Sequence, residues 1–164
     1  MNRRDDPCAA AARLPRGVTG FWTAGQAAPP DIDQREFRGV CDRAARLTGG
    51  RAAGQPSVGP ARSFVAVSIV YPDRARTVLC NLHWPFIAIA EPTSPDDEAT
   101  FVFMDDPHLA ATISRISRYR ALTRAELATP LAKCDLSELD DAELAQVRYW
   151  KPETVGDTLF NCWD

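Results

Sequence analysis

The chain has 164 residues, of which 45% are hydrophobic and 25% charged, a composition that fits one soluble globular domain and excludes a fibrous or largely disordered chain. Its formal net charge of -3 argues against a general electrostatic affinity for nucleic acid or for an anionic lipid surface. The charge is unevenly divided, because residues 1–90 sum to +5 and residues 91–164 sum to -8.

The short apolar segments and the spacing of the cysteines predict a cytoplasmic protein. Asp5, Asp6 and Arg13 interrupt any apolar stretch of the length found in secretory signals. The longest apolar segment, residues 84–90, is far shorter than the roughly 20 residues that a membrane helix needs. The five cysteines form no CxxC motif, which is typical of reduced thiols. We therefore expect a cytoplasmic location and no contact with a membrane.

The N-terminal region is rich in alanine, proline, glycine and arginine, without a sustained hydrophobic period. This composition predicts a disordered end over residues 1–19, followed by a single domain over residues 20–164. Phe21 and Trp22 are adjacent aromatic residues in an otherwise polar arm. They indicate that the arm lies against the body and buries at least one ring.

A first helix is predicted after residue 33. Asp33 and Glu36 have the spacing of a capping box, and Gly49 and Gly50 supply a stop. Five residues recur at helical spacing on one face and are expected in the core: Phe37, Val40, Cys41, Ala44 and Thr48.

Strands are predicted next, after a loop over residues 49–60. Residues 63–71 are dense in β-branched and aromatic side chains on both alternating faces, which indicates a central strand. Pro72 and Asp73 predict a turn into an antiparallel partner, and Pro85 is expected to interrupt the sheet because it cannot donate a hydrogen bond. The other strands are expected at residues 77–82, 86–90 and 100–104.

Helix-start signals dominate the rest of the chain. Asp106 with Pro107, Thr123 with Glu126, and Asp140 with Glu143 each have the residue types and spacing of a helix N-terminus. A last amphipathic turn is indicated by Val155, Leu159 and Trp163. The order of elements predicts an α+β fold with a three- to four-stranded antiparallel sheet, at about residues 62–104, packed against the N-terminal helix and the C-terminal helices.

Catalytic chemistry has one candidate. Cys80 and His83 could form a thiol and imidazole pair, as in a small cysteine-dependent hydrolase or transferase. In a strand, however, residues three apart point to opposite faces, so a buried thiol beside a hydrogen-bonded histidine is the favoured interpretation. With two histidines in the chain and no Gly-rich phosphate loop, we expect no metal site, cofactor or nucleic-acid partner.

Acidic residues after residue 90 are candidates for a partner-binding face. The acidic candidates are Glu91, Asp96, Asp97, Glu98, Asp105 and Asp106. Complementary potentials steer association between proteins, so this face would suit a basic protein. The alternative is that these acids sit in loops and at helix N-termini, where they stabilise the helix dipole.

The C-terminal segment carries a resemblance. Residues 148–164, RYWKPETVGDTLFNCWD, are unusually rich in large rings, which implies docking into the core or into a partner. The string resembles the end of a group of small bacterial proteins similar to the immunity proteins of toxin systems, and the likeness extends to residues 20–23 (GFWT) and 79–83 (LCNLH). The resemblance implies a non-enzymatic inhibitor of a toxin and brings no catalytic residue. Self-association stays open.

Overall fold

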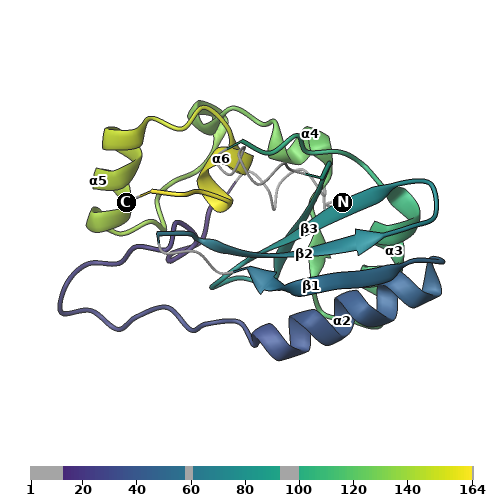
Figure 1. The fold of residues 1–164 in the computed structure, drawn as a ribbon. Helices are drawn as coiled ribbons and strands as arrows, with labels where there is room; N and C mark the ends of the chain where they lie inside the picture. The colour runs from purple at the N-terminus through teal and green to yellow at the C-terminus, as the bar shows by residue number, and fades with distance from the viewer. Residues whose placement is uncertain (1–12, 58–60, 93–99, 164) are drawn as a thin grey trace, which may run out of the picture.

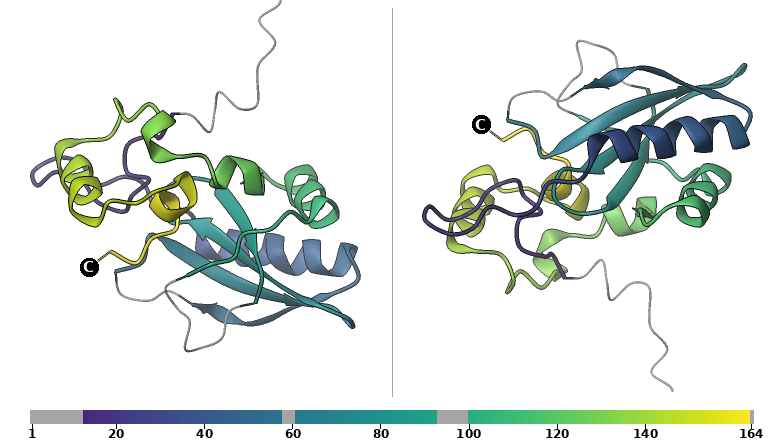
Figure 2. Two further views of the ribbon diagram at one scale, coloured as in Figure 1. Left: turned by 90° about the horizontal axis from the view of Figure 1, so that it is seen from above. Right: turned by 90° about the horizontal axis from the view of Figure 1, so that it is seen from below.

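The structure, a computed structural model, describes residues 13–57, 61–92 and 100–163. A single twisted sheet lies between helices α2 and α3 on one face and helices α4 and α6 on the other (Figure 1). Views from above and below show the two layers separately, with α4 and α6 over one face and α2 along the opposite face (Figure 2). The α+β prediction is therefore confirmed, with a sheet that is larger than expected.

The sheet has five strands in the order β1-β2-β3-β4-β5. All neighbours are antiparallel except β4 and β5, which run parallel. Side chains alternate along the strands, so that Val65 and Val67 face α2 while Phe64 faces the C-terminal layer. The strand bounds are β1 Arg51–Ser57, β2 Phe64–Val70, β3 Ala75–Asn81, β4 Phe86–Ala90 and β5 Arg120–Ala121.

Two predictions about the sheet were wrong. Residues 51–57 form β1, although the sequence predicts a loop at 49–60. The strand is irregular, with Gly54 at a φ of +74° and a shift of register between Ala53 and Ser57, so it has no clear alternating pattern. Residues 100–104 were predicted to be a strand but form only an isolated bridge, Phe103 to Ala90. The other end of β4 is occupied by β5, which pairs with Phe86 and Ile87.

Helix α2 (Gln34–Leu47) begins where its capping residue predicts. The Asp33 carboxylate accepts hydrogen bonds from the backbone N–H groups of Arg35 and Glu36, at 2.9 and 3.1 Å. The chain leaves the helix through Gly49, whose φ of +87° is readily adopted by glycine. Phe37 and Cys41 are fully buried against the sheet.

The remaining helices are α3 (Pro107–Ile116), α4 (Arg124–Leu127), α5 (Asp141–Trp150) and α6 (Val155–Leu159), with a 3-10 turn at Leu131–Lys133. Helix α3 is capped by Asp106, and α4 and α5 carry the capping boxes that their sequences predict. Helix α6 has a further capping box, from Thr154 and Asp157. Local signals thus placed every one of these helix starts except the last.

The N-terminal arm joins the core earlier than predicted. Leu14 and Val18 are buried in the C-terminal layer, although residues 1–19 were expected to be a disordered end. Residues 1–12 lie outside the described part of the chain. Further along the arm, Phe21 is half-buried and Trp22 exposed. The arm is anchored by Oε1 of Glu143, which accepts from the Gly17 N–H and the Thr19 hydroxyl; this distant partner is not visible in the sequence of residues 1–19.

In the part of the chain that the structure describes, no helix is both long and apolar enough to cross a membrane.

Candidate functional site

The C-terminal segment after α6 is fastened to the sheet by hydrogen bonds. Asn161 is buried, and its side-chain amide donates to the carbonyl oxygens of Thr19 and Thr158, both at 2.9 Å. The Ser63 hydroxyl accepts from the Asn161 N–H at 2.9 Å and donates to the Leu159 carbonyl, also at 2.9 Å. The segment that ends at Trp163 therefore has a defined path over the C-terminal layer.

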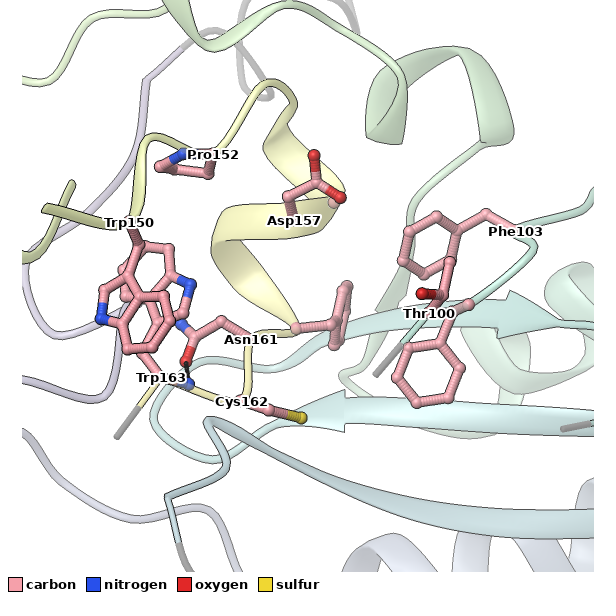
Figure 3. A pocket seen from close by; sticks show the side chains of 11 residues that line it. Thr100, Phe103, Trp150, Pro152, Asp157, Asn161, Cys162 and Trp163 are labelled. Atoms are coloured by element: carbon pink, nitrogen blue, oxygen red, sulfur yellow. Dashed lines mark hydrogen bonds between the residues drawn. The ribbon is translucent and has the colours of Figure 1, made fainter. Parts of the chain in front are cut away.

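An aromatic hollow lies beside this segment, with a volume of about 310 Å³ (Figure 3). Trp150 and Trp163 lie on one side of it, and Phe103 lies on the opposite side with Thr100 (Figure 3). Asp157 and Pro152 complete one edge and Cys162 another. We call this the aromatic hollow; its lining residues are Thr100, Phe101, Phe103, Trp150, Pro152, Gly156, Asp157, Phe160, Asn161, Cys162 and Trp163.

The wall made by Phe103 depends on a glycine. A Cβ atom at Gly156 would lie 2.6 Å from Cε2 of Phe103, so only glycine permits α6 to approach this ring so closely. Phe103 also packs against Phe160, with ring centroids 5.9 Å apart. These contacts hold the ring in place without any partner molecule.

Among the described residues that line the aromatic hollow, Asp157 is the only charged one. One of its carboxylate oxygens accepts a hydrogen bond from the Thr154 N–H, at 3.2 Å, in the capping box of α6. Its side chain forms no ion pair with any described residue. The hollow thus combines several aromatic rings with a single negative charge.

Next to the hollow, two rings project from the last turn of α5. Tyr149 is 75% exposed and Trp150 is 39% exposed. Their ring centroids are 5.2 Å apart in an edge-on arrangement, and the Trp150 indole N–H donates to Gln146 at 3.0 Å. The helix stops directly after them because Lys151 adopts a left-handed conformation and Pro152 follows. We call Tyr149 and Trp150 the aromatic rim.

A second hollow, of about 400 Å³, lies on the other side of the same C-terminal segment and shares Asn161 and Trp163 with the first. Its remaining walls come from the N-terminal arm, at residues 19–21, and from residues 61–63. Arg62 is the charged residue among those that line it. The charged residues among the described lining residues are thus Asp157 in the first hollow and Arg62 in the second.

The Cys80 and His83 pair is not supported by the geometry. Cys80 is buried among the residues that face α2, its thiol contacts the Asn81 carbonyl oxygen at 3.4 Å, and burial raises its pKa well above the ordinary value. His83 instead contacts the arm: its Nδ1 atom lies 3.2 Å from both the Pro30 carbonyl and the Asp31 carboxylate. The thiol stays protonated in such surroundings, so it is not activated as a nucleophile.

The predicted acidic binding residues lie in different surroundings. Asp105 accepts from the Arg124 N–H at 2.8 Å, and Asp106 caps α3 while its carboxylate pairs with Arg76 at 3.0 Å. Both are thus used within the fold. Glu91 is exposed and follows β4, and its N–H donates to Val102, the residue between Phe101 and Phe103 of the aromatic hollow. Asp96, Asp97 and Glu98 lie outside the described residues.

Within residues 13–57, 61–92 and 100–163, no three histidine, cysteine or acidic side chains come together as metal ligands could. Comparisons with family models, with curated proteins and with solved structures found no match to this chain.

The ring-rich residues 148–164 supply most of the lining of the aromatic hollow, but the sequence did not indicate the hollow itself. The density of rings in residues 148–164 left core and interface as alternatives; Phe160 and Trp163 are buried in the core, whereas the aromatic rim is exposed. The contribution of Phe101 and Phe103 was missed, because residues 100–104 were interpreted as a strand. A pair of aromatic residues at i and i+2 was the available signal that one face of this segment meets the aromatic hollow.

Proposed function

We propose that this chain is a non-enzymatic protein-binding protein of the immunity type, which inhibits a bacterial toxin by docking a basic surface of it. The observation that carries the proposal is the exposed aromatic rim beside the aromatic hollow. Tyrosine and tryptophan are the residues most enriched among those that dominate binding energy in protein interfaces, especially where a pocket lies next to them.

The rim is unusual because two large aromatic rings on one helical turn remain exposed to water. Tyr149 leaves three quarters of its surface in water, although its neighbour Trp150 lines the aromatic hollow. Covering these two rings by a partner would remove apolar area from water, which favours association at roughly 25 cal/mol per Å². The segment that resembles immunity proteins, residues 148–164, contains both rings of the rim and most of the residues that line the hollow.

The charge near the site is mixed: Arg148 and Lys151 are exposed cations that flank the rim, and the carboxylates that favour a basic partner lie near the hollow. Asp157 is in the hollow and Glu153 is exposed between α5 and α6. Neither forms an ion pair with a described residue, unlike Asp106, which pairs with Arg76. Glu91 provides a third exposed carboxylate, next to Val102. Such groups steer a partner of opposite charge and raise the association rate.

The test is affinity capture from the native host with a quantitative comparison of variants. The full chain is used in three forms: wild type, the double variant Y149S/W150S, and the control L47S. Leu47 is 52% exposed at the end of α2, so its variant removes a comparable exposed apolar side chain from the opposite layer. Circular dichroism confirms that all three are folded.

We expect one basic protein to be captured equally by wild type and L47S, and about tenfold less by Y149S/W150S. The same protein should be inhibited in its toxic activity by wild type and by L47S. If capture is unchanged by the double variant, or if no protein is enriched above the background of an unrelated bait, the proposal is wrong.

A further inference from the structure

We infer that the aromatic hollow is a receptor for one cationic side chain, an arginine or lysine of the partner, held between the rings and the Asp157 carboxylate. The identity of the partner rests on the proposed function. The cation site itself rests on the geometry of the hollow and can be tested without any partner.

The lining of the hollow suits a cation. A guanidinium or ammonium group is attracted to the face of an aromatic ring, most strongly to tryptophan, within about 6 Å of the ring centroid. Two tryptophans, Trp150 and Trp163, lie on one side of the hollow and Phe103 lies opposite (Figure 3). A carboxylate at the edge, from Asp157, provides the opposite charge. This chain uses the same chemistry internally, since Arg74 lies 4.1 Å from the centroid of the Tyr71 ring.

The size of the hollow limits the occupant. At about 310 Å³, it is at the lower end of the range of about 300–1,000 Å³ for pockets that hold whole small molecules. One long side chain with its charged end is therefore a better match than a cofactor. Because the hollow opens beside the exposed rim, such a side chain can enter from a protein surface that also covers Tyr149.

Charge separates this hollow from its neighbour. Among its described lining residues, the second hollow has Arg62 as its charged group and borders the same Asn161 and Trp163. Among its described lining residues, the aromatic hollow has Asp157 and no basic side chain. A cationic probe must therefore distinguish the two sites even though a single segment of chain separates them.

The rings are held in place before anything binds. The Trp163 ring packs against Phe21 with centroids 6.3 Å apart, the Trp150 indole N–H donates to Gln146 at 3.0 Å, and Phe103 is enclosed by Gly156 and Phe160. Asp157 is oriented by the Thr154 N–H. Little side-chain entropy is then lost when the cation enters, which is the main way in which a preformed pocket gains affinity.

The experiment titrates the full chain with blocked single amino acids and follows the tryptophan indole N–H signals by NMR. The probes are N-acetyl-arginine methylamide, the lysine analogue, and N-acetyl-norleucine methylamide as a neutral probe of similar length. We expect the two cationic probes to shift the Trp150 and Trp163 signals with dissociation constants of about 1–10 mM. The Trp22 signal, which is outside the hollow, should stay in place.

Variants assign the charge. D157N retains an oxygen that can accept from the Thr154 N–H, so the cap of α6 survives while the charge is lost; we expect cation binding to weaken about two- to fivefold. The matched control is D141N, an exposed acid in the first turn of α5 that does not line the hollow, and it should bind as wild type. W150L should weaken the arginine probe by a similar factor and leave the norleucine probe unaffected.

The inference is overturned if norleucine binds as well as arginine, if D157N and D141N behave alike, or if the cationic probes shift no tryptophan signal of the hollow. Those results leave the capture experiment unaffected, since a partner can depend on the rim without inserting a cation. Conversely, loss of rim-dependent capture with cation binding intact would overturn the proposed function alone.

Discussion

The two layers that cover the sheet are held together by different forces. The α2 layer is apolar and made from regular elements, with Phe37, Cys41 and Ala44 of α2 packed on the valines and isoleucines of the strands. The C-terminal layer is assembled from short helices and irregular segments, and its contacts include many buried hydrogen bonds between residues far apart in the chain. Its central group is Glu143, which is completely buried.

The difference shows how an irregular layer becomes specific. Apolar contacts tolerate alternative packings, whereas each buried donor must find its own acceptor. Asn81 donates to the carbonyls of Val18 and Leu159, both at 2.8 Å, and so joins the arm and the end of α6 to β3. The aromatic hollow lies in this layer, where polar contacts position segments that have no regular structure.

Some of the opposite charges in the two halves of the chain form ion pairs with each other. Arg13 pairs with Asp135 and Glu138, and Arg16 pairs with Asp140, all at 3.3–3.4 Å. Each pair joins a basic residue of the N-terminal arm to an acidic residue of the C-terminal half. The exposed pairs of Arg13 contribute about 1 kcal/mol or less, whereas the Asp140 side chain of the Arg16 pair is largely buried.

The largest expected effect on the free energy of unfolding is in the α2 layer. F37A removes a fully buried ring that contacts Tyr119, with centroids 5.7 Å apart, and should lower the free energy of unfolding by about 4 kcal/mol. Urea denaturation measures it. Where the variant is folded, its arginine-probe affinity should equal that of wild type, because the hollow is in the other layer; a weakened probe affinity would contradict the separation of the layers.

The variant E143A tests the buried hydrogen bonds of the C-terminal layer. Glu143 accepts from the Gly17 N–H, from the Thr19 hydroxyl and from the Asp140 N–H, at 2.9, 2.7 and 3.0 Å. Losing the acceptor leaves these buried donors unpaired, so we expect a loss of about 3 kcal/mol. Hydrogen exchange should become faster at Gly17 and Thr19. The control E138A removes an exposed carboxylate and should cost about 0.5 kcal/mol or less; an equal loss in both variants would refute the role of Glu143.

The pH dependence of stability isolates the same carboxyl group. Burial raises the pKa of Glu143, although hydrogen bonds from Thr19, Asp140 and Gly17 oppose the shift. The folded state therefore binds a proton at a higher pH than the unfolded state does, and this group adds stability as the pH falls from 7 toward about 4.5. Relative to E143Q, wild type should gain stability over this range.

The comparison of wild type with E143Q also cancels the contribution of Asp140, whose pKa shift has the opposite sign. Burial acts to raise the pKa of Asp140, but hydrogen bonds from Thr23 and Glu143 lower it overall. The contribution of Asp140 to the free energy of unfolding therefore decreases as the pH falls. Both proteins retain Asp140, and its contribution largely cancels in the difference. A difference that stays constant from pH 7 to about 4.5 would show that Glu143 does not titrate abnormally.

The smallest expected effect is at Tyr119, beneath α2. Its buried hydroxyl has no hydrogen-bond partner among the described residues. Y119F keeps the ring contact with Phe37 and removes a polar group that is costly to bury, so the free energy of unfolding should be unchanged or rise by about 1 kcal/mol. A loss comparable to that of F37A, measured in the same denaturation series, would reveal a polar contact in the apolar layer.

The local parts of this architecture follow from the sequence. Asp33, Thr123 and Asp140 start helices because their side-chain oxygens bond to N–H groups two or three residues later, which needs no distant partner. Strands β2, β3 and β4 were placed because dense apolar or alternating runs are visible within one segment. The α+β class followed from the order of these elements.

Tertiary structure decided the rest, because the remaining features depend on partners far along the chain. Strand β1 exists by pairing with β2, and β5 by adding to β4 in parallel, although neither has a pattern of its own. Leu14 and Val18 are ordered by a layer that begins more than a hundred residues later. The sequence by itself determined which segment carries the large rings; the fold decided that Trp163 is buried, that Tyr149 is exposed, and that Phe103 lines a hollow opposite Trp150 and Trp163.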